Sequence, residues 1–219
     1  MRHTVHLAHN RLQLALHRLR DGDGRALLLL HGLGEASPDT TPDWAERWPG
    51  PVWALDFTGH GASGIPMGGG YSAEILLADA DIALEHIGEA TVVGRGLGAY
   101  VALMLGGARA AQVRGVVLCD GPGLFGGATG PTSNSFIVMP QPTTVPDAYA
   151  LHEMSKDLRP RDYAALFVRL ALDNSPLPKH VNPVSVAAVV RPPWLAAVVD
   201  EVGTVETTLA EALAQYGSC

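Results

Sequence analysis

The chain has 219 residues, of which 47% are hydrophobic and 17% are charged, a composition typical of one folded globular domain. Its formal net charge of −7 at pH 7 argues against a nucleic-acid-binding protein, which would carry a basic surface. No signal peptide, membrane-spanning run or metal-ligand spacing of the two cysteines, Cys119 and Cys219, is recognisable, so we predict a cytoplasmic protein without membrane contact, metal or cofactor.

The first half of the chain alternates between strand and helix patterns. Residues 4–8 and 12–19 are predicted to form a β-hairpin, and the run Ala26–Leu30 is apolar throughout, as in a strand buried in a parallel sheet. Further strands are expected at residues 52–55, 90–93 and 113–119, and helices at 72–87 and 97–108. This alternation predicts an α/β fold: a mostly parallel sheet with antiparallel N-terminal strands and helices on both faces.

The second half of the chain has weaker patterns. Residues 121–145 are rich in Gly, Pro, Ser and Thr, which predicts an irregular segment. Helices are expected near residues 146–158 and 161–172, and a strand over residues 183–190. The tail to Tyr216 is predicted to be mostly helical, with a break at Gly203.

Three glycine-containing segments follow predicted buried strands, at the end of the sheet where open α/β folds bind ligands. In order, they are His31-Gly32-Leu33-Gly34, the stretch 56–64 and Gly94-Arg95-Gly96-Leu97-Gly98. In this order and spacing they resemble the α/β-hydrolase superfamily. The resemblance implies that the first segment supplies a backbone N–H group to an oxyanion hole, and that the third is a nucleophile elbow of the G-x-S-x-G type. It also implies a single domain, residues 1–219, with a lid-type insertion at 121–182.

The chain departs from the family pattern at each catalytic position. Gly96 stands where the family has its nucleophilic serine, so the hydroxyl that forms the acyl-enzyme is missing, although glycine tolerates the strained turn. The family's histidine comes after a final strand, but no histidine follows His180. The turn after the strand at 183–190 carries no carboxylate, which leaves Asp120 as the acid at a position that some members use. We therefore predict a degenerate member that does not hydrolyse esters through an acyl-enzyme.

Three functions remain open for such a protein. The leading hypothesis is binding of a small anionic, carboxylate or ester-like ligand, or of a protein partner, with backbone N–H groups at the elbow as donors. The predicted ligand-binding residues are Gly32, Leu33, Arg95, Gly96 and Leu97. One alternative is a hydrolase or lyase whose unorthodox chemistry uses His31, His60 and Asp120. The other alternative is an interaction subunit with an empty pocket.

The C-terminal end of the sheet is predicted to be incomplete. The family's sheet continues with one more strand and helix after the position of residues 183–190, and the sequence predicts that both are missing. An apolar edge of this kind is a template for pairing with another chain. The tail carries apolar residues at helical spacing, namely Trp194, Val198, Val202, Val205, Leu209 and Leu213. We expect this stripe to be buried and favour a homodimer through the C-terminal region; the alternative is that the tail packs on its own sheet.

Overall fold

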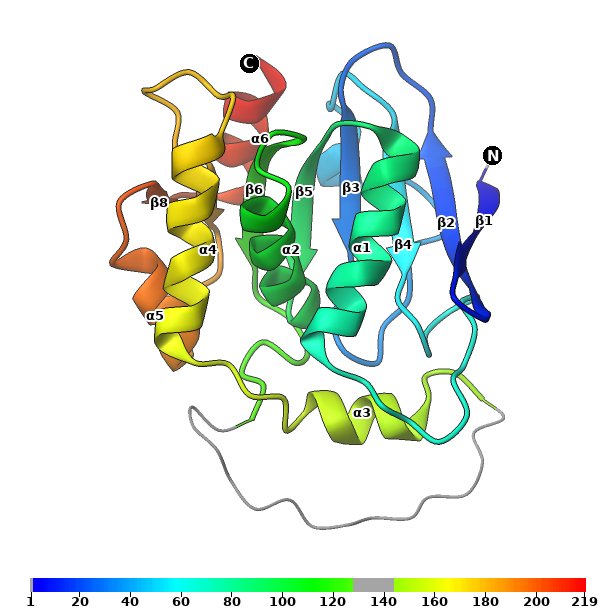
Figure 1. The fold of residues 1–219 in the computed structure, drawn as a ribbon. Helices are drawn as coiled ribbons and strands as arrows, with labels where there is room; N and C mark the ends of the chain where they lie inside the picture. Colours follow the sequence, from blue (N-terminus) through cyan, green and yellow to red (C-terminus); the bar gives the residue numbers. More distant parts are fainter. Residues whose placement is uncertain (1, 128–143) are drawn as a thin grey trace.

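The computed structural model describes residues 2–127 and 144–219, and within these ranges one sheet of eight strands forms the centre of the molecule (Figure 1). The strand order is β1-β2-β4-β3-β5-β6-β7-β8. The strand β2 pairs antiparallel with β1 and β4, and the other five strand pairs are parallel, so the predicted fold class is confirmed. The strands are β1 (His3–His9), β2 (Leu12–Arg20), β3 (Ala26–Leu30), β4 (Val52–Asp56), β5 (Ala90–Arg95), β6 (Val113–Cys119), β7 (Val184–Val186) and β8 (Thr204–Glu206).

Helices cover both faces of this sheet. The described helices are α1 (Ala73–Ile87), α2 (Leu97–Ala108), α3 (Ala148–Met154), α4 (Arg161–Asn174), α5 (Pro193–Val199) and α6 (Leu209–Gly217), with a 3-10 helix, η1, at Asp43–Ala45. The helices α1, α2, α4 and α5 share one hydrophobic core with the sheet, whereas α6 and η1 belong to a second core on the opposite face. Figure 1 shows α1, α2 and α4 in front of the sheet and α6 behind it.

The sequence of β3 explains how the sheet can be covered on both sides. All five of its residues are buried, and they alternate between the two cores: Leu28 and Leu30 face α1 and α2, and Leu27 and Leu29 face α6 and η1. The helix α2 lies close against the sheet, because a Cβ atom on Gly98 would overlap the carbonyl oxygen of Leu30. A residue without a side chain at position 98 thus allows α2 to pack tightly on the sheet.

The end of the sheet is shortened, but it is not missing. The predicted strand at 183–190 has only three residues in β7, and β8 pairs with it in parallel, with Val184 opposite Thr204. The prediction of an edge without its neighbour is therefore wrong, since β8 and α6 take those places. The strand β8 is not recognisable from the sequence, because three residues are too few to show an alternating pattern. Gly203, where a helix break was predicted, has a φ of +98° and immediately precedes the strand.

The predicted apolar stripe of the tail is divided among three elements. Trp194 and Val198 on α5 and Leu213 on α6 are buried within the same chain. Val202, between α5 and β8, is 79% exposed, so the six residues do not form one helical face. The tail thus packs on its own sheet, and the homodimer stays a prediction that this packing does not require.

The predicted lid-type insertion, residues 121–182, contains parts that lie in different places. Its residues 128–143 lie outside the described ranges. Figure 1 shows α3 lying across the carboxyl ends of the parallel strands. The helix α4 instead belongs to the core that covers the sheet, where Ala164 and Val168 are fully buried.

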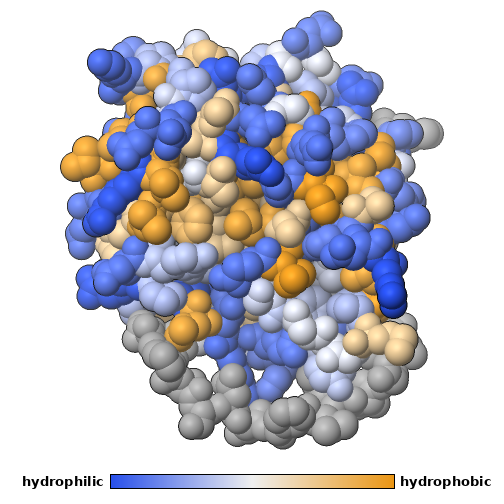
Figure 2. Space-filling model, in the orientation of Figure 1, coloured by the Kyte–Doolittle hydropathy of each residue, from blue (hydrophilic) through white to orange (hydrophobic). Residues whose placement is uncertain are grey.

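The surface of the described chain is mixed in character. Figure 2 shows apolar side chains interspersed with hydrophilic ones on the face that carries α1 and α4, and Ile75, Leu166 and Leu170 are among the exposed apolar residues of these helices. No helix in residues 2–127 and 144–219 is both long and apolar enough to cross a lipid bilayer.

Candidate functional site

The elbow is a one-residue turn between β5 and α2. The strand ends at Arg95, the helix begins at Leu97, and Gly96 between them has φ +59° and ψ −118°. This conformation is costly for residues with a side chain, and glycine adopts it readily. The predicted tight strand-to-helix turn at Gly96 is confirmed.

The space that a side chain at position 96 would need is filled by the loop after β6. A Cβ atom built on Gly96 would overlap the carbonyl oxygen of Pro122 and lie 2.6 Å from the carbonyl carbon of Gly121. Conversely, a Cβ atom on Gly121 would lie 2.9 Å from the backbone nitrogen of Gly96. The two glycine backbones therefore pack directly against each other, and a serine does not fit here without movement of backbone atoms.

The backbone donors that the sequence predicted for an oxyanion hole converge on this same loop. The N–H groups of Leu33 and Leu97 donate to the carbonyl oxygen of Pro122 at 3.0 and 2.9 Å. The N–H group of Gly32 donates to the Glu35 carboxylate at 3.0 Å. The structure thus brings the predicted donors together, but around an oxygen of the chain itself. A ligand at the N–H groups of Leu33 and Leu97 would have to displace that oxygen.

A buried arginine contacts the two residues that follow Pro122. Arg159, between α3 and α4, is 2% exposed, and its Nη1 atom donates to the carbonyl oxygens of Gly123 and Leu124 at 2.7 and 2.8 Å. The indole N–H of Trp194 donates to the Leu124 oxygen as well, at 2.8 Å. The guanidinium carbon of Arg159 lies 4.7 Å from the ring centre of Tyr100, within the range of a cation–π contact. Neither Pro122 nor Arg159 is among the residues that the sequence predicts for the site.

The two candidate histidines lie side by side, with ring centroids 5.1 Å apart, and each is bound on both nitrogens by the backbone. The N–H of Phe57 donates to Nε2 of His31 at 3.1 Å, and Nδ1 of His31 donates to the Gly32 oxygen at 2.7 Å. Burial lowers the pKa of His31 to about 4, so its ring is neutral at neutral pH.

His60 has the same arrangement. The N–H of Gly34 donates to its Nε2 atom at 3.2 Å, its Nδ1 atom donates to the Thr58 oxygen at 3.1 Å, and burial lowers its pKa. Because the lone pair of each ring already accepts a backbone hydrogen bond, neither histidine has a free nitrogen to take a proton from a bound molecule. Both side chains therefore shape the loops beneath the elbow.

The two buried histidines predict a stability that falls in mild acid. An unfolded histidine has a pKa near 6.5, whereas folded His31 takes up a proton only near pH 4, so the unfolded state binds more protons between these values. Stability is then fully present above pH 6.5 and is lost as the pH falls towards 4, by about 3 kcal/mol from His31. Urea unfolding at pH 7 and pH 4 measures this difference, which His31→Gln should reduce. The exposed His6 provides the control His6→Gln, and an equal pH dependence in both variants would contradict the assignment.

The third candidate, Asp120, is not part of this histidine pair. Its carboxylate accepts hydrogen bonds from the N–H groups of Val189 and Val190 at 2.6 and 3.0 Å, so it orders the segment after β7.

The position of the family's histidine, after the final strand, is taken by other residues. The strand β8 is followed by Thr207 and by Thr208, which caps α6, and neither is a histidine. No group of three or more His, Cys, Asp or Glu residues that could hold a metal ion occurs in the described part of the chain.

Arg95 lies at the edge of the elbow and is half exposed. Its Nη1 atom forms an ion pair with Oε1 of Glu35 at 3.0 Å. Because Glu35 also accepts the N–H group of Gly32, this pair ties the end of β5 to the loop after β3. Of the five predicted ligand-binding residues, Arg95 alone presents a charged side chain at the surface.

Comparison with known proteins agrees with this geometry. A family model described as the alpha/beta hydrolase family matches residues 27–217. The thioesterase domain from the curacin biosynthetic pathway superposes with a TM-score of 0.65 at 16% identity, covering 100% of this chain and 98% of that one.

Other solved structures are similar over a smaller part. An E-2-(acetamidomethylene)succinate hydrolase shares 25% identity at a TM-score of 0.46 over 54% of this chain and 44% of its own. An alpha/beta hydrolase from Novosphingobium aromaticivorans shares 24% identity at a TM-score of 0.47, over 53% of this chain and 43% of its own. A comparison with curated proteins gave no match. The sheet order, the elbow and the family model together show that the chain belongs to the alpha/beta hydrolase family.

Proposed function

We propose that this chain is a non-hydrolytic member of its family, which binds a small acyl compound, either a carboxylate or an ester-like molecule, without forming an acyl-enzyme. The observation that carries the proposal is the position of Pro122. Its carbonyl oxygen accepts the N–H groups of Leu33 and Leu97 and stands where a side chain at Gly96 would begin. The same oxygen thus excludes a nucleophile and fills the place of a developing oxyanion.

Two further features support binding rather than turnover. His31 and His60 accept backbone hydrogen bonds on the nitrogen that a general base would use. Asp120 is engaged by the N–H groups of Val189 and Val190. Hydrolysis by these three residues would require each of them to leave a hydrogen bond that orders the backbone, and such bonds are costly to leave unmade.

An ester assay tests the proposal directly. With p-nitrophenyl butyrate, we expect the purified protein to release p-nitrophenol no faster than the variant His60→Gln does, because the backbone already occupies the His60 ring nitrogen that a general base would use. The variant His6→Gln, which changes an exposed histidine, should release it at the same rate. Comparison with His6→Gln separates turnover from acylation of surface histidines. Release well above buffer that His60→Gln or Asp120→Asn abolishes would contradict the proposal.

A further inference from the structure

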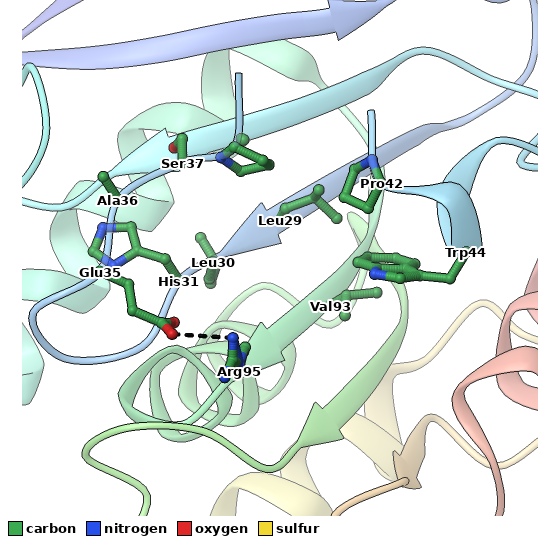
Figure 3. A pocket seen from close by; sticks show the side chains of 12 residues that line it. Leu29, Leu30, His31, Glu35, Ala36, Ser37, Pro42, Trp44, Val93 and Arg95 are labelled. Carbon is green, nitrogen blue, oxygen red and sulfur yellow. Dashed lines mark ion pairs between the residues drawn. The ribbon is translucent and has the colours of Figure 1, made fainter. Parts of the chain in front are cut away.

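A hollow lies on the face of the sheet opposite α1 and α2. Its floor consists of strand residues, among them Leu29 from β3 and Val93 from β5 (Figure 3). Ala54 from β4 lines the floor as well. The hollow exists because residues 31–51, which connect β3 to β4, contain only the three-residue helix η1 to cover the sheet. Its volume of about 420 Å³ falls within the range of small-molecule sites.

The two ends of this hollow differ in chemistry. At one end, Pro42 and Trp44 form an apolar wall, and the Trp44 side chain is 42% exposed. At the other end lie Arg95 and Glu35, joined by their ion pair (Figure 3). Small-molecule sites combine apolar and polar groups in this way, since an exposed indole at one end supplies contact area and a charged pair at the other end fixes orientation.

We propose that this hollow binds a small neutral acyl compound, an apolar ring or chain that ends in a carboxamide. The carbonyl oxygen of the amide accepts from the Arg95 guanidinium, its N–H group donates to the Glu35 carboxylate, and the apolar part lies against Trp44. The inference rests on the proposed function: it places the ligand in this hollow and narrows its class to the neutral, ester-like acyl compounds, so that a carboxylate is not the ligand.

The charges at the polar end favour a neutral ligand. Arg95 and Glu35 carry one positive and one negative charge, so a carboxylate on Arg95 would be repelled by Glu35, and an ammonium group on Glu35 would be repelled by Arg95. A carboxamide offers an acceptor and two donors without a charge. It can therefore form hydrogen bonds with both side chains, and no charged group of the ligand has to be removed from water.

This site does not require the elbow to open. Leu29 and Val93 face the hollow, whereas Leu97 packs in the core on the other side of the sheet. The Pro122 oxygen can thus remain on the N–H groups of Leu33 and Leu97 while a ligand contacts Arg95.

The test compares three probes that share one phenyl ring: 3-phenylpropanamide, 3-phenylpropionate and 3-phenylpropylamine. Isothermal titration calorimetry should show saturable binding of the amide, about tenfold or more tighter than either charged probe. Arg95→Gln and Trp44→Ala should each weaken amide binding about tenfold or more, because a hydrogen bond to a charged group or a large apolar contact is lost. Glu35→Gln should tighten the binding of 3-phenylpropionate, because it removes the repelling charge.

The control variant is Arg109→Gln, which breaks an ion pair with Asp81 between α2 and α1, on the other face of the sheet, and should leave amide binding unchanged. Urea unfolding of each variant shows that it is folded. The inference is overturned if the amide does not bind, if the carboxylate binds more tightly than the amide, or if Trp44→Ala and Arg95→Gln both leave amide binding unchanged. Any of these results together with an absence of ester turnover would refute this ligand and site but leave the non-hydrolytic assignment intact.

Discussion

Replacing Gly96 with serine is expected to lower the free energy of unfolding by about 3–5 kcal/mol. One part of this cost, about 1–3 kcal/mol, comes from placing a side chain in a sparsely populated backbone conformation, with φ +59° and ψ −118°. The rest comes from overpacking, because the new Cβ atom would overlap the carbonyl oxygen of Pro122 and crowd the carbonyl group of Gly121, and these backbone atoms cannot rotate away.

A second glycine separates the two contributions. Gly88 also has a positive φ, +94°, but a Cβ atom there would meet nothing within 4 Å. Gly88→Ser should therefore cost only the backbone part, about 1–3 kcal/mol. Urea denaturation of both variants measures the difference. Equal costs at the two positions would mean that the space beside Gly96 is open and that the Pro122 loop does not fill it.

Most of the fold follows from local patterns in the sequence. The apolar run of β3 and the Ser72 cap that begins α1 are local signals: the Ser72 hydroxyl accepts the N–H group of Ile75 at 3.3 Å, as an N-cap residue does. The end of the sheet could not be predicted in this way. In β8, Thr204–Glu206 is held in place by pairing with β7, which is a non-local interaction that three residues do not encode.

The candidate site, too, can be predicted from the sequence only where it depends on local patterns. The glycine pattern around Gly96 predicts a strained turn, and that turn is present. The groups that occupy the site are backbone atoms from a loop 26 residues further along the chain, and a carbonyl oxygen has no signature in a sequence. Gly121 and Gly123 flank Pro122, but adjacent glycines in a Gly- and Pro-rich segment indicate a loop and do not tell where that loop lies.

Arg159→Met is expected to destabilise the fold by about 3–5 kcal/mol, the cost of breaking a buried ion pair from one side. The Asp157 carboxylate would lose its cationic partner at 3.4 Å, and burial already raises the pKa of Asp157. The carbonyl oxygens of Gly123 and Leu124 would lose the Arg159 donor as well. Arg114→Met is the control: it breaks an ion pair with Glu89 at the surface and should cost at most about 1 kcal/mol in urea unfolding.

The same variant tests whether Arg159 fastens the Pro122 loop over the elbow. If it does, losing Arg159 frees Gly123, the loop opens more often, and the N–H groups of Leu33 and Leu97 lose their acceptor. Hydrogen exchange at these two amides should then accelerate more than at Leu28 in the middle of β3, which reports on opening of the sheet. Acceleration by the same factor at all three amides would mean that Arg159 stabilises the whole domain without a particular hold on the loop. The conclusion that Arg159 fastens the Pro122 loop therefore requires both results, a large loss of stability and a selective loss of exchange protection at Leu33 and Leu97.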